Sequence, residues 1–342
     1  MSSTSQPSLL QRANDGLRRI PFVKRSRRAW AIAGALMVAL VVASVFSNRG
    51  FLGWGVIVIA VIMVLPFSQS RALLGAWVPY ASMWFIFTFF RSFADETVLA
   101  KTLNTKVPHF ERWIFGGELP SVRLQDALFN PNHLHWWDYY FTFTHWSYFL
   151  IPHVVAVYLW WKHPNIFRQY TYALMLMLTV GLLIYFLIPS NPPWMAPEAI
   201  NTPGAPTVTR IMNSVGNELG GAIYKAGYDA IGESNPIAAM PSIHFAVTFM
   251  LFWVARTRGR IWTLLALFYA ASMGVGLVYL GEHYAIDVTV GGIITTYSWF
   301  AVGAWFRRVA PVIGHPLQHD HGSAMTGGEG STSPIAQPAG AK

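Results

Sequence analysis

Long apolar runs alternate with short polar connections along most of the chain. Several of these runs approach or exceed the roughly 18 residues that a helix needs to cross a bilayer. Trp and Tyr stand at several of their ends, as interfacial anchors do. The pattern predicts an all-α, polytopic membrane helix bundle. Its eight predicted helices span approximately Trp30–Ser47, Phe51–Phe67, Leu73–Phe90, Tyr139–Trp161, Phe167–Ile188, Ser242–Ala255, Ile261–Leu280 and Ala285–Phe306.

Composition agrees with a membrane protein. Hydrophobic residues make up 54% of the chain and charged residues only 11%, which is unlike an ordinary soluble domain. Cysteine is absent, so disulfides, thiolate metal sites and cysteine catalysis are excluded. The net charge is +9, but the sequence shows no basic folded surface of the kind that binds nucleic acid. We therefore expect no nucleic-acid partner.

The basic residues predict the orientation in the membrane. Arg and Lys crowd the segment before the first helix, and every second connection after it is basic without acids, whereas the intervening connections are mixed or acidic. The positive-inside rule then places both termini in the cytoplasm. The basic residues of the later connections are Arg71, Lys162, Arg168, Arg256, Arg258, Arg260, Arg307 and Arg308.

Two connections on the predicted outer side are too long to be simple turns. The first, 91–138, contains FERWIFGGELPSVRLQDAL, a mixture of aromatic and charged residues typical of an interfacial segment. The second, 189–241, opens with PSNPPWMAP, whose prolines end the preceding helix. It continues with an i,i+4 apolar stripe, which predicts a helix lying over the site. The stripe consists of Ile211, Val215, Leu219 and Ile223.

Two short motifs carry candidate chemistry on the outer side, each where an apolar run begins. They are PSIH (Pro241–His244) and GEHYAID (Gly281–Asp287). His283 and Asp287 are four residues apart, so on a helix they share one face. A His–carboxylate couple with a second histidine is what phosphoryl transfer through a histidine nucleophile requires. Ionisable groups beside hydrocarbon are costly, which favours a functional interpretation for His244, His283 and Asp287.

Two other interpretations use the same residues. Two histidines and a carboxylate are also a ligand set for zinc, but the spacing is not that of H-E-x-x-H, so we expect no metal or other cofactor. Alternatively, His283 and Asp287 would have a structural role only, in a hydrogen bond that holds two helices together at the membrane interface. For Asp138 and His145, in the fourth predicted helix, buried polar contacts and a functional role explain the residues equally well.

A phosphoryl group also needs positive charge and hydrogen-bond donors around its oxygens. Arg91 ends the third apolar run and Arg210 lies in the long outer loop, so both are candidate substrate ligands. Ser242 is a natural helix N-cap, and the free backbone N–H groups beside it suit a phosphate oxygen. Asn191 and Trp194 complete the predicted substrate-binding set, although Trp194 would also serve as a membrane anchor.

Several stretches of the sequence resemble one family. They are FGGELPSVRLQ (Phe115–Gln125), NPPWMAP (Asn191–Pro197), AAMPSIHFA (Ala238–Ala246), YLGEHYAIDVTVGG (Tyr279–Gly292) and RSFAD (Arg91–Asp95). The chain resembles the type 2 phosphatidic acid phosphatase superfamily and, within it, the inositol phosphorylceramide synthase-like branch. The superfamily pattern is K-x6-R-P, P-S-G-H and S-R-x5-H-x3-D. Here Ile243 replaces the glycine, Gly276 and Leu277 replace the S-R pair, and no K-x6-R-P precedes PSIH.

The resemblance implies a fold and an activity. It implies a six-helix core, here with two extra N-terminal helices, and a metal-independent enzyme in which His283 is the nucleophile, Asp287 orients it and His244 is the general acid. The branch implies a membrane-embedded phosphotransferase that moves a phosphoryl head group, with phosphoinositol as the candidate, between lipids. Its substrates would be phospholipid, polyprenyl or sphingolipid-type lipids. A lipid phosphate phosphatase and a non-enzymatic lipid-binding or transport protein are the alternatives.

The predicted organisation follows from these observations. We expect a basic cytoplasmic N-terminal segment over 1–28, an integral membrane catalytic domain over 29–310, and a disordered cytoplasmic tail over 311–342, which is rich in Gly, Ser, Pro and Ala. The protein would reside in the plasma membrane with its active site on the extracytoplasmic face.

Overall fold

The computed structural model describes residues 71–103, 106–195, 208–221 and 238–312. The two predicted N-terminal helices, the basic N-terminal segment and the C-terminal tail lie outside these residues. Within them the fold is all-α, as predicted, and its β structure is limited to one isolated bridge between Ser190 and Ala238.

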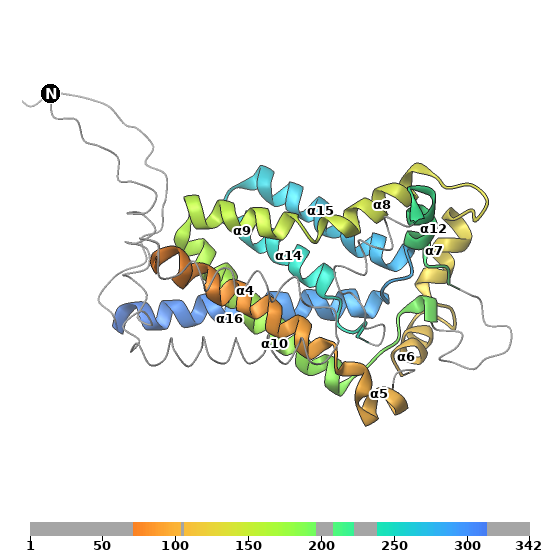
Figure 1. The fold of residues 1–342 in the computed structure, drawn as a ribbon, viewed down its shortest axis with the longest axis horizontal. Helices are drawn as coiled ribbons and strands as arrows, with labels where there is room; N and C mark the ends of the chain where they lie inside the picture. The colour runs from red at the N-terminus through yellow and green to blue at the C-terminus, as the bar shows by residue number, and fades with distance from the viewer. Residues whose placement is uncertain (1–70, 104–105, 196–207, 222–237, 313–342) are drawn as a thin grey trace, which may run out of the picture.

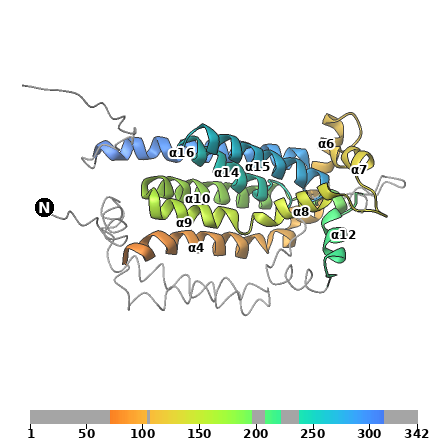
Figure 2. The ribbon, with the colours of Figure 1, turned by 90° about the horizontal axis from the view of Figure 1, so that it is seen from above.

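The core is a bundle of long helices that run side by side (Figures 1 and 2). Its helices are α4 (Arg71–Arg91), α8 (Trp136–Ser147), α9 (Ile151–Lys162), α10 (Pro164–Leu187), α14 (Ile243–Arg256), α15 (Arg260–Tyr279) and α16 (Ala285–Val312). Three stretches among the described helices are long and apolar enough to cross a membrane: Pro164–Leu187, Arg260–Tyr279 and Ala285–Arg308. The chain is therefore a membrane protein with a helical bundle.

The fourth predicted helix, Tyr139–Trp161, is interrupted. It forms α8 and α9, with a break over Tyr148–Leu150. Pro152 opens α9 in its first turn, where proline is tolerated because the N–H it lacks has no helical partner there. The run stays apolar and aromatic through the break, so its hydropathy predicted one continuous helix.

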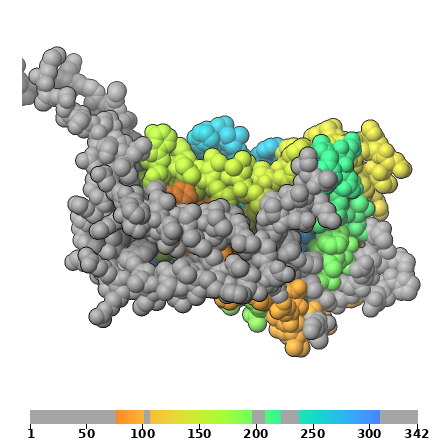
Figure 3. All heavy atoms as spheres, viewed as in Figure 1, coloured from red at the N-terminus to blue at the C-terminus, as the bar shows by residue number. Residues whose placement is uncertain are grey.

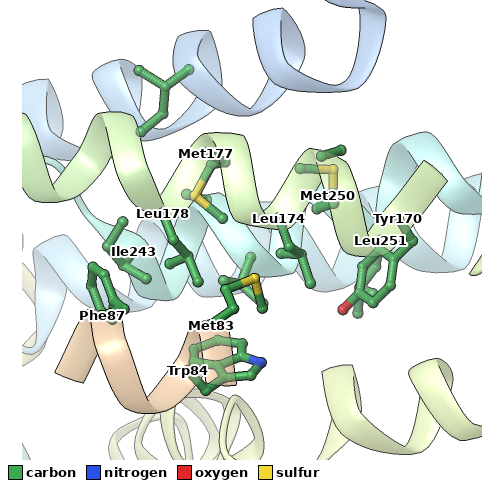
Figure 4. Close-up of a cluster of buried hydrophobic side chains, with 14 of the residues drawn as sticks. Met83, Trp84, Phe87, Tyr170, Leu174, Met177, Leu178, Ile243, Met250 and Leu251 are labelled. Atoms are coloured by element: carbon green, nitrogen blue, oxygen red, sulfur yellow. The ribbon is translucent and has the colours of Figure 1, made fainter. Parts of the chain in front are cut away.

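Close contact between α4, α10 and α14 forms the largest buried cluster (Figure 4). Between membrane helices such contacts act mainly through van der Waals packing, since lipid tails are as apolar as the side chains. Gly181 of α10 marks how close α10 and α14 are: a Cβ there would lie 2.8 Å from Cδ1 of Ile243. The side chains labelled in this cluster are Met83, Trp84, Phe87, Tyr170, Leu174, Met177, Leu178, Ile243, Met250 and Leu251.

Short helices gather at one end of the bundle (Figures 1 and 2). The predicted interfacial segment forms α6 (Lys106–Ile114) and α7 (Pro120–Leu128), and the predicted helix of the second long connection is α12 (Ile211–Glu218). In the space-filling view the green atoms of α12 lie against the yellow atoms of the α7–α8 segment (Figure 3). The remaining short elements are η3 (Ala94–Glu96), α5 (Val98–Leu103) and η4 (Pro193–Met195).

Gln125 of α7 fixes this end to the bundle. Its Nε2 donates to the carbonyls of Thr209 and Tyr279, each at 2.8 Å, and its Oε1 accepts from the Thr209 N–H at 2.8 Å. Gly281 follows α15 with φ +78°, a left-handed conformation that favours glycine. A Cβ at Gly281 would also lie 2.9 Å from the Thr209 carbonyl oxygen. The segment before α12 is thus held tightly against the start of GEHYAID.

Candidate active site

The N-terminus of α14 is joined to α16 through Ser242. The Ser242 side chain caps α14 by accepting from the Phe245 N–H at 3.3 Å. Its own backbone N–H donates to the Asp287 carbonyl at 3.0 Å. The N-cap role predicted for Ser242 is therefore present, and its proposed contact with a phosphate oxygen stays a prediction.

The start of α16 carries the carboxylate beside its histidine. Asp287 is fully buried, and its Oδ2 accepts the Tyr284 N–H at 2.9 Å. The same oxygen lies 3.4 Å from Nδ1 of His283, longer than a normal hydrogen bond, and this Nδ1 makes no hydrogen bond among the described residues. Catalytic hydrogen bonds are often long in a free enzyme and tighten when substrate binds.

The second histidine lies on the other side of the His283 ring. Nδ1 of His244 is 3.2 Å from Nε2 of His283, and both side chains are buried. His283 thus has the carboxylate of Asp287 at one ring nitrogen and His244 at the other. This order, in which a carboxylate holds one nitrogen and leaves the other to react, is that of an oriented histidine nucleophile beside an acid–base partner.

The broken fourth helix supplies two further rings to the site. His145 and Tyr148 both lie with ring centroids 4.5 Å from that of His244, and Nδ1 of His145 is 3.1 Å from Sδ of Met212 in α12. His145 is buried at this position. For His145 the sequence allowed two interpretations, a buried polar contact between helices and a functional role. The helix break that follows His145 lies just before Pro152, a proline signal that the hydropathy pattern alone does not register.

Arg210 and Trp194 meet beside the motif. The Arg210 Nε and Nη2 donate to the two carboxylate oxygens of Glu282, at 2.7 and 3.1 Å. The guanidinium also lies 5.1 Å from the ring centroid of Trp194, a cation–π distance, and the Trp194 N–H donates to the Gly281 carbonyl. The structure brings both predicted residues to the first two residues of GEHYAID, with Arg210 paired to an acidic partner that the sequence did not indicate.

The last two predicted ligands also lie close to the motifs. Asn191 is buried and its Oδ1 has no hydrogen-bond partner among the described residues. The guanidinium of Arg91 lies 5.9 Å from the ring centroid of Tyr185, whose hydroxyl donates to the Pro241 carbonyl at 3.0 Å. Arg91 therefore reaches PSIH through one intervening side chain.

Gly291 of α16 sets how closely α14 approaches, and its substitution gives a test of the site geometry. A Cβ at Gly291 would lie 2.6 Å from the Ser242 carbonyl oxygen, a backbone atom that moves only with the start of α14. We expect Gly291→Ala to separate His244 from His283 and to lower turnover about 10²-fold, the loss typical of an ångström-scale misplacement. Turnover of a lipid phosphate by the purified variant is the measurement.

Gly292→Ala is the matched control, because a Cβ there would meet side-chain atoms alone, the Phe245 ring at 3.3 Å and the Phe249 ring at 3.9 Å. It should retain most of the activity. Equal activities of the Gly291 and Gly292 variants would contradict this account of the approach between α14 and α16.

A comparison with known protein families identifies the superfamily of the chain. The model of the PAP2 superfamily matches residues 107–301, which include PSIH and GEHYAID. The chain belongs to the PAP2 superfamily. No curated protein and no solved structure gave a match.

Membership confirms the superfamily resemblance and the class of activity. This PAP2 protein is a membrane enzyme of the phosphatase and phosphotransferase type that acts on lipid phosphates. The match covers the short helices α7 and α12, the interrupted fourth predicted helix (α8 and α9) and the start of α16. The convergence of these segments around His244 and His283 therefore lies within the part of the chain that the family defines.

Proposed function

We propose that the protein is a lipid phosphotransferase that moves a phosphoryl head group through a phosphohistidine intermediate on His283. The observation that carries the proposal is the row of three groups, in which Asp287 and His244 lie at opposite nitrogens of the His283 ring. The site residues of the proposal are His283, Asp287 and His244 for the chemistry and Arg91, Arg210, Ser242, Asn191 and Trp194 for substrate binding.

In the first step, the lone pair on Nε2 of His283 attacks phosphorus, and the bond from phosphorus to the departing lipid oxygen breaks. His244 donates a proton to that oxygen, and Asp287 stabilises the positive charge that develops on the His283 ring. In the second step, the oxygen of an acceptor hydroxyl attacks phosphorus and the bond from phosphorus to Nε2 of His283 breaks, which returns the lone pair to the ring, while His244 takes the hydroxyl proton. A phosphorus atom between nucleophile and leaving group needs more room than the 3.2 Å between the two rings, so His244 moves aside when substrate binds.

The acceptor separates a transferase from a phosphatase. A lipid hydroxyl as acceptor gives transfer of the head group, and water gives hydrolysis. The departures from the phosphatase motifs favour transfer, since Gly276 and Leu277 replace the S-R pair as in the inositol phosphorylceramide synthase-like branch. Phosphoinositol is the candidate head group, and metal-independent chemistry is part of the proposal.

Phosphate contacts must then come from residues outside those motifs. Arg210 forms a bidentate pair with Glu282, the residue that precedes His283 in the chain, and phosphate oxygens can take the place of that carboxylate. Arg91 approaches PSIH from α4 through Tyr185. We propose that these two arginines neutralise the phosphoryl oxygens, with the Asn191 side chain and the amides following Ser242 as further donors.

The site is proposed to face the extracytoplasmic side of the plasma membrane. It lies at the end of the bundle where α14 and α16 begin, and both helices end toward the other end of the bundle (Figure 1), where basic residues stand in or just after their last turns. By the positive-inside rule the basic end is cytoplasmic. The basic residues are Arg256, Arg258, Arg260, Arg307 and Arg308.

Product analysis tests the function. Purified protein is incubated with phosphatidylinositol and other phospholipid donors together with a hydroxyl lipid acceptor, and products are identified by mass spectrometry. We expect a new phosphodiester lipid and an equal amount of the donor's diacylglycerol or equivalent alcohol. Inorganic phosphate released from a lipid monoester without any transfer product would replace the transferase with a phosphatase.

A further inference from the structure

A second buried carboxylate lies at the start of α16. Glu111 of α6 is fully buried, and its Oε1 and Oε2 accept the backbone N–H groups of Ala285 and Ile286, at 3.1 and 2.9 Å. It is 174 residues away from its first partner in the chain. A carboxylate from another helix thus satisfies two of the N–H groups that a helix N-terminus leaves without helical partners.

The neighbouring N–H group is taken by the candidate catalytic carboxylate. Asp287 accepts the Tyr284 N–H through the same oxygen that lies 3.4 Å from His283. An acidic residue in the first turn of a helix is ordinarily drawn to the free N–H groups there. Glu111 already occupies the N–H groups of Ala285 and Ile286, so these two are not available to the Asp287 carboxylate.

We infer that Glu111 is a positioning residue for the phosphoryl transfer: by holding the amides that open α16, it keeps Asp287 oriented at the nucleophilic histidine. The inference rests on the proposed function. Its location supports it, because α6 is fixed on its inner side by Val107, which packs in one cluster with Tyr284. The outer side of α6 is exposed at Phe110 and Trp113.

The ionisation of Glu111 predicts how the turnover of the enzyme depends on pH. Burial, with a smaller contribution from Asp287, raises the pKa of Glu111 to about 7, against the opposing effect of its two backbone hydrogen bonds. The titratable groups that interact with it across the contact are Asp287 and Tyr284, whereas Arg112 donates to the Gly117 carbonyl instead. Above about pH 7 the ionised carboxylate accepts both amides, and below it the protonated group loses one acceptor, as a glutamine would.

The test compares Glu111→Gln with the wild-type protein over a range of pH. We expect kcat of the variant to be about tenfold lower near pH 8.5 with KM nearly unchanged, and the two proteins to converge near pH 5.5, where wild-type Glu111 is protonated. A merely structural role would give a ratio of kcat values that does not follow pH. A pH-independent ratio, or equal kcat at high pH, would overturn the inference.

Glu118→Gln is the matched control, since the Glu118 side chain is 43% exposed on the same segment and forms an ion pair with Arg123. It should behave as wild type at every pH. If Glu111→Gln is not obtained folded, Glu111→Asp replaces it. That variant keeps the charge but is one methylene shorter, so we expect a lower kcat at unchanged KM, and a wild-type kcat would overturn the inference. His283→Ala separates the two proposals, because retained activity in that variant rejects the proposed function itself.

Discussion

Replacement of His283 by alanine is expected to abolish turnover of lipid phosphates, by at least about 10³-fold, while the protein remains folded. The reason is chemical: Nε2 of His283 forms the bond to phosphorus in the proposed mechanism, and the carboxylate of Asp287 lies at the other nitrogen of that ring. The measurement is product formation by purified variant in mixed micelles, with the folded state checked by thermal unfolding.

His133→Ala is the matched control for this substitution. His133 is exposed in the segment between α7 and α8, and the variant should keep wild-type activity. More than about a tenth of wild-type turnover in His283→Ala would show that another group attacks phosphorus.

Replacement of His244 by glutamine is expected to lower turnover about 10²- to 10⁴-fold for natural lipid substrates, the range for loss of a general acid. Glutamine is close in size and keeps a hydrogen-bonding group between the rings of His145 and Tyr148. A lipid alkoxide is a poor leaving group and needs the proton, whereas a nitrophenolate does not. The loss should therefore be much smaller for a nitrophenyl phosphate ester. The measurement is kcat/KM for both substrate types.

The same pair of substrates separates the roles of the two histidines. His283→Ala should lose activity toward both substrates alike, because both require the nucleophile. Equal losses of His244→Gln toward alkyl and aryl esters would contradict a general-acid role for His244.

Much of the bundle is predictable from the sequence. Hydropathy located the helices that became α4, α10, α14, α15 and α16, because an apolar run of sufficient length has few alternatives in a membrane. The break between α8 and α9 escaped prediction, since a change in backbone direction need not change hydropathy. The first half of the apolar stripe correctly predicted α12, in which Ile211 and Val215 pack against Tyr279 and Leu280. Leu219 lies just past the helix and is exposed, and Ile223 lies outside the described residues.

The candidate site, like the bundle, was only partly predictable from the sequence. His244, His283 and Asp287 were predicted from motif spacing. His283 lies two residues before α16, so the turn that opens the helix, and not a shared helix face, brings it to Asp287. Glu111 was visible only as one acid in an interfacial segment, because its contact with α16 joins residues far apart in the chain. Arg210 was predicted as a phosphate ligand, yet its pairing with Glu282 required the tertiary fold.

Chemical trapping of the intermediate is the most direct test of the central claim. The purified enzyme is mixed with donor lipid in the absence of an acceptor, quenched in alkali to preserve phosphohistidine, digested and analysed by mass spectrometry. The account predicts a phosphoryl-containing adduct on His283, absent from His283→Ala, whose mass identifies the group transferred: phosphate alone or phosphate with its head-group alcohol. An adduct on a different residue, or full turnover with no adduct on His283 at any time, would contradict it.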